Sequence, residues 1–284
     1  MTTASNLLPE ERFKRLVAGP DEEIRLAEAA LLIACDEYRD LDVDDYLAQL
    51  DVMAGTFKRR LWPDISPTDT IVRLNRFLFD EQGFAGNADH YYDPRNSFLN
   101  EVLDRKLGIP ITLGLVYIEI SRRAGLPMQG VSFPAHFLVK CRMRKGTVVL
   151  DPYAKGLSLS IDDLRHRIGE LHAGRMPTKS HVTAMLNAAS NREILLRMLC
   201  NLKNIYIGNG QWLKALAAAD RIVAVMPDAA VGYRDRAMIH LELECFRAAL
   251  ADFQTYLEKE PAAEDEAAVR RSVIRLQATA ARLN

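Results

Sequence analysis

The sequence has few cysteines, and none is spaced for a metal site. Its 284 residues include only Cys35, Cys141, Cys200 and Cys245. No two form a CxxC pair, and none lies at a zinc-ligand spacing from a histidine, so we expect no metal and no other cofactor. Sparse, unpaired thiols are typical of proteins of the reducing cytoplasm. Each cysteine is most simply interpreted as a small buried hydrophobic residue.

Long apolar runs and blocks of like charge are also missing. The longest stretch without Asp, Glu, Lys or Arg is 124–139, and its glycines and prolines exclude a membrane helix. Charged residues interrupt the N-terminus where a signal peptide needs an apolar region. The net charge is -1, with the two signs interspersed, so no broad basic face is present. We therefore expect a cytoplasmic protein that binds neither nucleic acid nor membrane.

Length and composition predict a globular protein with two domains. The chain is 49% hydrophobic and 26% charged and is longer than a typical single domain. Apolar spacing predicts helices over about 24–34 and 43–58, and Ser66 with Pro67 is a strong start signal for a third. We expect residues 1–85 to be an N-terminal helical region packed on a core at 86–175.

The stretch from Gly108 to Gly156 holds the most informative pattern. An apolar helix follows Pro110 and ends at the basic residues 122 and 123. Two β-type runs, 131–141 and 147–153, then predict a β-hairpin. With the turn centred between residues 143 and 144, His136 faces Asp151 and Leu138 faces Val149, and the two polar groups share one face of the sheet. The other face then carries apolar residues: Phe137, Val139, Val148 and Leu150.

His136 and Asp151 are candidate catalytic residues. Opposed residues have Cβ atoms about 5 Å apart, close enough for an imidazole to carboxylate hydrogen bond. Such a bond fixes the imidazole tautomer and stabilises the imidazolium, which is the role of the third member of a catalytic triad. A nucleophile is expected at the start of the preceding helix, where the macrodipole lowers the pKa of a thiol. Thr112 occupies that position, and no cysteine does.

Each candidate also has a structural interpretation. A bond between His136 and Asp151 can tie two strands together without any catalysis. Thr112 can cap the helix through its hydroxyl, and Asp151 before Pro152 can start a turn. The cysteines do not easily supply the missing nucleophile, because three lie in helical patterns and Cys141 has the opposite strand parity to His136.

Five short segments resemble the transglutaminase-like proteins of the bacterial SirB type, which join a transglutaminase-like core to C-terminal tetratricopeptide helices. The segments are YDPRNS at 92–97, GIPIT at 108–112, GLP at 125–127, PAHFLV at 134–139 and LDPY at 150–153. The likeness to classical transglutaminases and papain-like proteases is limited to the order helix, histidine strand, aspartate strand. It implies that His136 is the base and Asp151 its orienting partner, with the cysteine position falling at 110–112.

The resemblance also shows two small departures and implies a fold. In SirB-type proteins the residue before the histidine is usually glycine and the hydroxyl residue is often serine, whereas this chain has Ala135 and Thr112. A missing thiol is typical of that family. We therefore expect a mostly helical α+β fold, with a transglutaminase-like (papain-like) core of one helix and an antiparallel sheet. An N-terminal helical region and a C-terminal α-helical, tetratricopeptide-like array complete it.

The C-terminal part, 185–284, has a repeat. Pro227 and Pro261 are 34 residues apart, the period of a tetratricopeptide repeat, and each follows an apolar helix. Two repeats and a last helix over about 263–283 are predicted; Arg236 and the lack of an early glycine depart from the pattern. Such repeats usually present a concave surface to a peptide or helix, although a pair this short could instead brace the core.

Two functions follow from these patterns. The first is a transglutaminase-like protein without a catalytic cysteine, a non-catalytic cytoplasmic interaction or regulatory module whose repeats bind a protein or peptide. The second is an amide-processing hydrolase or acyl-transferase, in which His136 and Asp151 activate a nucleophile that the sequence does not identify.

Overall fold

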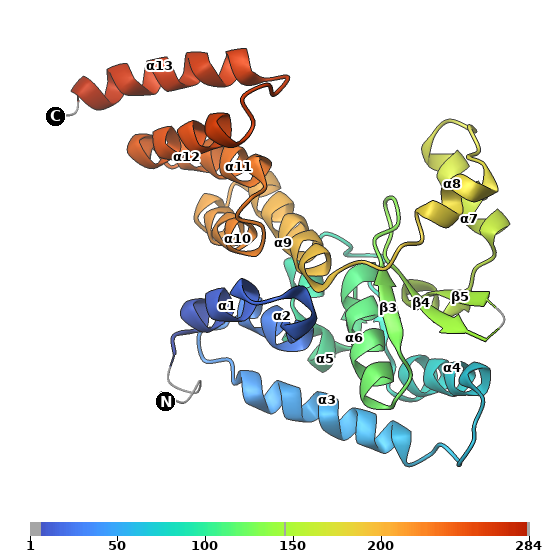
Figure 1. Ribbon diagram of the computed structural model, residues 1–284. Helices are drawn as coiled ribbons and strands as arrows, with labels where there is room; N and C mark the ends of the chain where they lie inside the picture. Colours follow the sequence, from blue (N-terminus) through green and yellow to red (C-terminus); the bar gives the residue numbers. More distant parts are fainter. Residues whose placement is uncertain (1–6, 145, 283–284) are drawn as a thin grey trace. The chain divides into compact units, whose positions relative to one another are not determined.

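The chain folds into two compact units. A computed structural model describes residues 7–144 and 146–282 (Figure 1). One unit is Arg25–Ile194, and the other joins Met1–Ile24 to Leu195–Asn284. The fold is α+β and mostly helical, with a small antiparallel sheet in the first unit, as predicted. Within the described ranges, no helix is long and apolar enough to cross a membrane.

The first unit is built around a buried helix, α6 (Pro110–Arg123). Helix α3 (Val43–Lys58) packs on α6, and α2 (Leu26–Ala34) packs on α3 and α5 (Leu99–Arg105). Every residue of α2 is buried, and all of them except Glu28 are apolar. Helix α3 has the predicted bounds, and α4 (Pro67–Asn75) begins at the predicted cap, where the Ser66 hydroxyl accepts a hydrogen bond from the Asp69 N–H at 3.1 Å.

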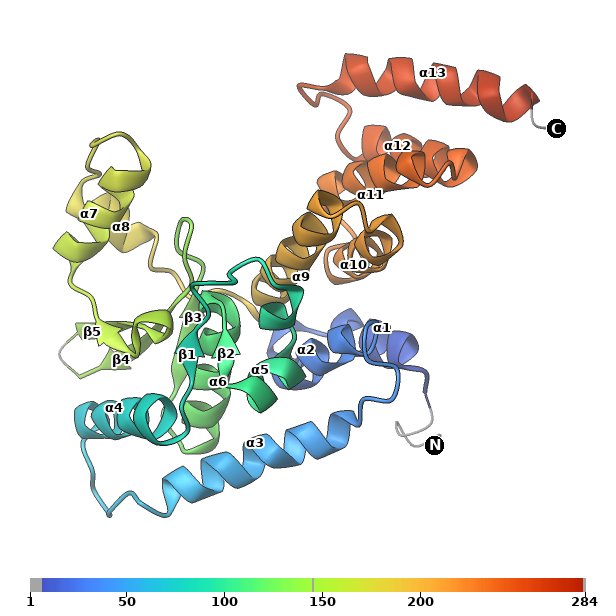
Figure 2. The same cartoon turned by 180° about the vertical axis from the view of Figure 1, so that it is seen from behind.

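A four-stranded antiparallel sheet follows α6 in the chain. Its strands are β3 (Met128–Val131), β4 (Leu138–Met143), β5 (Gly146–Asp151) and β6 (Leu157–Ser158), in that spatial order. Figure 1 shows α6 lying alongside β3. A Cβ on Gly114 of α6 would lie 2.6 Å from the Phe137 ring, so helix and sheet approach closely there. A separate parallel pair joins β1 (Ala85–Gly86) to β2 (Leu107–Gly108) (Figure 2).

Helices also cover the other face of the sheet. Leu138 and Val149 are buried in a cluster with residues of α7 (Ile161–Leu171) and α8 (Lys179–Ala184). Residues 172–178 connect these two helices. The sheet is therefore covered on both faces at the end of β5, where Asp151 is buried.

The predicted hairpin forms, but its register is different. Met143 pairs with Gly146 and Val139 with Leu150, so the turn is centred one residue later than expected and every pair shifts by two residues. The predicted pairing of His136 with Asp151 as directly opposed strand residues is therefore wrong. A shift of two leaves each side chain on its original face. Phe137, Val139 and Leu150 are buried as expected, whereas Val148, near the hairpin turn, is only half-buried.

The run 131–141 is also not one strand. Residues 132–137 form a loop between β3 and β4, so His136 lies just before β4. Pro134 has no N–H to donate to a neighbouring strand, and the His136 N–H instead closes a turn on the Phe133 carbonyl at 3.1 Å. Ala135 has a φ of 53°, a left-handed conformation that glycine adopts more easily. The alanine that stands here in place of the usual glycine therefore costs conformational energy.

A buried hydrogen-bonded tie connects α4, α6 and the turn after β5. The Tyr117 hydroxyl donates to Asn75 Oδ1 at 2.8 Å, and Asn75 Nδ2 donates to the Gly156 carbonyl at 3.0 Å. Gly156 has a φ of 74°, and a Cβ there would lie 2.1 Å from Asn75 Oδ1. Only glycine satisfies both the backbone conformation and this close approach.

The second unit is an array of helices. It contains most of α9 (Asn191–Gly208), α10 (Trp212–Val225), α11 (Ala230–Glu242), α12 (Phe246–Lys259) and α13 (Glu266–Arg282). Neighbouring helices from α10 to α13 pack in sequence order, as expected of a helical repeat.

One further helix of this unit comes from the other end of the chain. Helix α1 (Pro9–Ala18) packs on α10, where Phe13 and Val17 are buried and the Arg221 guanidinium lies 4.5 Å from the centroid of the Phe13 ring. This helix was not predicted from the sequence. The limits 1–85, 86–175 and 185–284 remain predictions of domain boundaries; the compact units are divided differently because α1 belongs with the repeats.

The departure at Arg236 has a structural explanation. Its guanidinium lies 2.7 Å from Asp252 of α12 and 2.8 Å from Asp220 of α10. Asp252 is buried, and the two carboxylates raise the pKa of the guanidinium against the lowering effect of its own burial. Arg236 therefore connects α11 to both α10 and α12 through ion pairs, which a small side chain at this position could not form.

Candidate functional site

The two candidate catalytic residues form a hydrogen bond. His136 Nε2 lies 2.9 Å from Asp151 Oδ1, and their side chains are 21% and 2% exposed. Asp151 ends β5, and the same Oδ1 also accepts hydrogen bonds from the N–H groups of Tyr153 and Ala154 at 3.1 and 3.3 Å. The carboxylate therefore starts the Asp-Pro turn and is also hydrogen-bonded to the imidazole.

A third residue, Arg167, completes the polar cluster. Its guanidinium on α7 lies 2.8 Å from Asp151 Oδ2, so each carboxylate oxygen has a cationic or hydrogen-bonding partner. This residue was not predicted from the sequence. Its only local signal is its position beside the buried Ile168 on an amphipathic helix, and that pattern is equally typical of a solvated arginine.

The environment keeps Asp151 ionised. Burial raises the pKa of the carboxyl, but the hydrogen bonds and charges of His136 and Arg167 lower it by more, so the net pKa is below its usual value. An ionised carboxylate can only accept, so Nε2 of His136 must carry the hydrogen of the bond between them. In the neutral imidazole the lone pair is then on Nδ1, which makes no hydrogen bond to any residue in the described ranges. This nitrogen can accept a proton.

Aromatic rings extend from the imidazole towards solvent. Tyr153 meets the His136 ring edge to face at 6.1 Å, Tyr91 meets Tyr153 at 6.3 Å, and Tyr92 meets Tyr91 at 5.3 Å between ring centroids. Tyr92 is exposed, whereas a Cβ on Gly86 would lie 2.4 Å from the Tyr153 ring. The row gives the imidazole an aromatic flank on one side.

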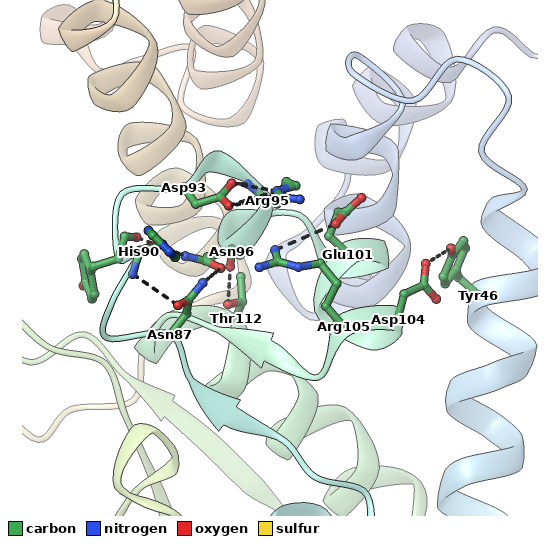
Figure 3. A network of polar contacts seen from close by, with 11 residues as sticks. Tyr46, Asn87, His90, Asp93, Arg95, Asn96, Glu101, Asp104, Arg105 and Thr112 are labelled. Atoms are coloured by element: carbon green, nitrogen blue, oxygen red, sulfur yellow. Dashed lines mark hydrogen bonds and ion pairs between the residues drawn. The ribbon is translucent and has the colours of Figure 1, made fainter.

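Thr112 is not hydrogen-bonded to this cluster. It is fully buried in the first turn of α6, where its hydroxyl donates to the Asn96 carbonyl at 2.7 Å and accepts from the Ile109 N–H at 3.1 Å (Figure 3). It is the third residue of the helix rather than the N-cap residue of the sequence interpretation, although its hydroxyl does satisfy a backbone N–H at the helix start. His136 is not among its partners.

The loop before α5 is fixed by the same network. The buried Asn96 donates from Nδ2 to the His90 carbonyl at 2.7 Å and accepts from Asn87 Nδ2 at 3.0 Å (Figure 3). The Asn87 side chain in turn accepts from the His90 N–H at 3.3 Å. The YDPRNS segment thus holds the loop that carries Tyr91 against the start of α6. The sequence identified this loop but not the role of Asn96.

None of the cysteines lies beside His136 in the chain or shares its hydrogen bonds. All four are free thiols, and Cys141 is buried on β4, where burial raises the pKa of its thiol. A raised pKa makes a thiol a poorer source of the nucleophilic thiolate. Among the described residues, no three or more His, Cys, Asp or Glu side chains are grouped so that they could hold a metal ion.

Comparison with known proteins identifies the family. A family model described as the transglutaminase-like superfamily matches residues 44–200, more than half of the chain. The chain belongs to this superfamily. The match includes all the polar residues of the transglutaminase-like site described above. A second model, a tetratricopeptide repeat, matches residues 202–273.

Several relatives span much of this transglutaminase-like protein. A UPF0162 protein of Xylella fastidiosa is 37% identical over 268 residues, which is 93% of this chain and 94% of the relative. A UPF0162 protein of Pseudomonas aeruginosa is 33% identical over 82% of this chain and 83% of its own length. Human F-box only protein 21 is 27% identical over 68% of this chain, but over only 34% of its own length. The shared region therefore also occurs within a larger protein.

Proposed function

We propose that this protein is a transglutaminase-like binding module without a catalytic cysteine, whose repeats hold a protein segment. The main support is the Thr112 hydroxyl, which is fully buried and donates to the Asn96 carbonyl. A threonine nucleophile needs an adjacent base, and His136 is not hydrogen-bonded to this one. The SirB-type assignment and the cytoplasmic location belong to the same proposal; they rest on the sequence motifs and on the sparse, unpaired cysteines.

The repeats offer a surface for such a partner on α11. Val231 and Met238 are seven residues apart, so they lie on the same side of the helix. They are 48% and 54% exposed, and exposed apolar residues that line up on a helix are suited to contact a partner. Tetratricopeptide repeats generally mediate contacts between proteins. We therefore place the partner on this side of α11.

A double substitution tests the binding surface. Val231→Asp with Met238→Asp is expected to weaken a partner recovered by cross-linking to the full chain at least tenfold in Kd, because two apolar contacts are replaced by desolvated charges. The affinity is measured by calorimetry with the purified partner. Val52→Asp on α3 is the matched control, since Val52 is 68% exposed in the other unit. Equal Kd values for the double variant and the wild type would contradict the proposal.

A second function, hydrolysis or acyl transfer at an amide, is favoured by one observation. The bond from His136 Nε2 to Asp151 leaves Nδ1 without a partner among the described residues, on a ring that is 21% exposed. An imidazole held in this way can act as a general base towards a water molecule or a hydroxyl group of the substrate.

We expect no measurable turnover of simple amide or ester substrates by the wild-type protein, because no nucleophilic side chain among the described residues is hydrogen-bonded to His136. The assay compares wild type with His136→Ala and with Thr112→Val, which removes the hydroxyl but keeps the side-chain volume. Turnover that is lost in His136→Ala but kept in Thr112→Val would establish water or substrate as the nucleophile and overturn the non-catalytic proposal. Turnover that is lost in both variants would assign the attack to Thr112.

A further inference from the structure

A pocket lies between the end of α3 and the helix α4. None of the residues around His136 lines it. Figure 2 shows the loop that connects these two helices. The pocket has a volume of about 400 Å³, within the range of small-ligand sites. The apolar part of the pocket wall is formed by the buried rings of Phe57 and Phe77. The side chains of Leu61, Trp62 and Val72 extend this apolar surface.

Three arginines and two carboxylates also line this pocket, and both carboxylates already have partners. Glu81 pairs with Arg60 and lies 3.7 Å from Arg76. Asp69 accepts a hydrogen bond from the Ser66 hydroxyl at 2.7 Å at the start of α4. The lining therefore has an excess of one positive charge that its own acidic residues do not neutralise.

Arg73 is the remaining arginine of the lining, and its guanidinium stacks on an aromatic ring. It lies 3.9 Å from the centroid of the Trp62 ring. It makes no hydrogen bond or ion pair with any residue that the structure describes. Stacking occupies the face of a guanidinium and leaves the N–H groups at its edge, which fit the two oxygens of a carboxylate or phosphate. The stacked Arg73 is therefore arranged to receive an anion.

The backbone beside this pocket is unusual. Residues Arg76–Glu81 form a π-helical turn that continues directly from α4. Such turns are rare and often occur at functional sites. Here the turn carries Arg76, Phe77 and Glu81, three of the residues that line the pocket.

We propose that this pocket binds a small organic acid, an anion that joins a carboxylate or phosphate group to an aromatic or aliphatic group. The anionic end meets the edge of Arg73, with Arg76 nearby, and the apolar end lies against the aromatic wall. This site is independent of the His136 cluster and of the partner surface on α11.

The proposal is tested on the full chain with three probes of similar shape: N-acetylphenylalanine, its neutral amide, and phenyl phosphate. Binding is measured by calorimetry and by ligand-observed nuclear magnetic resonance. We expect saturable binding of at least one anion and at least tenfold weaker binding of the amide, because a charge-assisted bidentate contact is lost. The anion with the lower Kd shows whether the natural ligand carries a carboxylate or a phosphate group.

Variants locate the binding. Arg73→Gln is expected to weaken the anion at least tenfold, and Arg73→Lys, which keeps the charge but loses the planar stack, should weaken it too. Arg144→Gln, at the exposed turn after β4, is the matched control, and His136→Ala should bind as the wild type does. Equal binding of acid and amide, no anion binding at millimolar concentration, or wild-type affinity in both folded Arg73 variants would overturn the proposal.

Discussion

Replacement of Asp151 by alanine is expected to lower the free energy of unfolding by about 3 kcal/mol. The carboxylate is buried and is bound to His136, Arg167 and the N–H groups of Tyr153 and Ala154. Its removal leaves two side chains and two backbone donors without their acceptor. We place the loss at the low end for a broken buried ion pair, because both side-chain partners are partly exposed to water. Urea unfolding of the two proteins measures it.

The isosteric variant Asp151→Asn separates charge from shape. Because the pKa of Asp151 is lowered in the folded protein, its charge stabilises the fold fully above the ordinary carboxyl pKa of 3.8. That contribution is lost as the pH falls from about 4 through the lower folded value. The unfolding free energy of Asp151→Asn should therefore decline less steeply below about pH 4 than that of the wild type. Parallel declines would contradict the lowered pKa.

Gly156→Ala is expected to cost about 3 kcal/mol, although it adds a single methyl group. A φ of 74° costs an alanine about 1–2 kcal/mol. The new Cβ would also lie 2.1 Å from Asn75 Oδ1, and moving that side chain breaks its hydrogen bonds to Tyr117 and to the Gly156 carbonyl. These lost bonds add about 1–3 kcal/mol. The thermal midpoint and urea unfolding report the change.

Gly83→Ala is the matched control for this substitution. Gly83 has a φ of 79°, and a Cβ there would meet nothing within 4 Å. The control variant carries the backbone cost alone, so its loss should be about 1–2 kcal/mol. If the two variants were equally destabilised, the tie through Asn75 would not contribute to stability.

The sequence predicts the parts of the fold that depend on local signals. The cap at Ser66, the bounds of α3 and the end of α6 at Arg123 match the structure, because caps and apolar spacing are read from a few neighbouring residues. The faces of the hairpin were predicted for a similar reason, since they depend on the alternation of side chains. Its register was not, because the turn has no Asn-Gly or Asp-Gly signal to fix its centre.

Features that depend on distant residues could not be predicted in this way. Arg167 approaches Asp151 only after α7 packs on the sheet, and Asn96 finds its partners in the loop and at the start of α6. Helix α1 does carry start signals, Pro9 and the acidic residues 10 and 11, but it is short. Only its packing on α10 shows where it belongs.

The position of α1 has a consequence for how the protein is made. On the ribosome α1 emerges before Arg25–Ile194, and α10 follows only after the whole of that unit has been synthesised. At 5–20 residues per second, the apolar side chains of Phe13 and Val17 wait on the order of 10–40 s for their partner helix. The transglutaminase-like unit can fold during that interval. The segment between α1 and α10 is then a folded insert and not a long flexible loop, so the entropic cost of bringing the two helices together is smaller. The helical array thus closes after the transglutaminase-like unit, and until it does a nascent chain carries α1 without its partner helix.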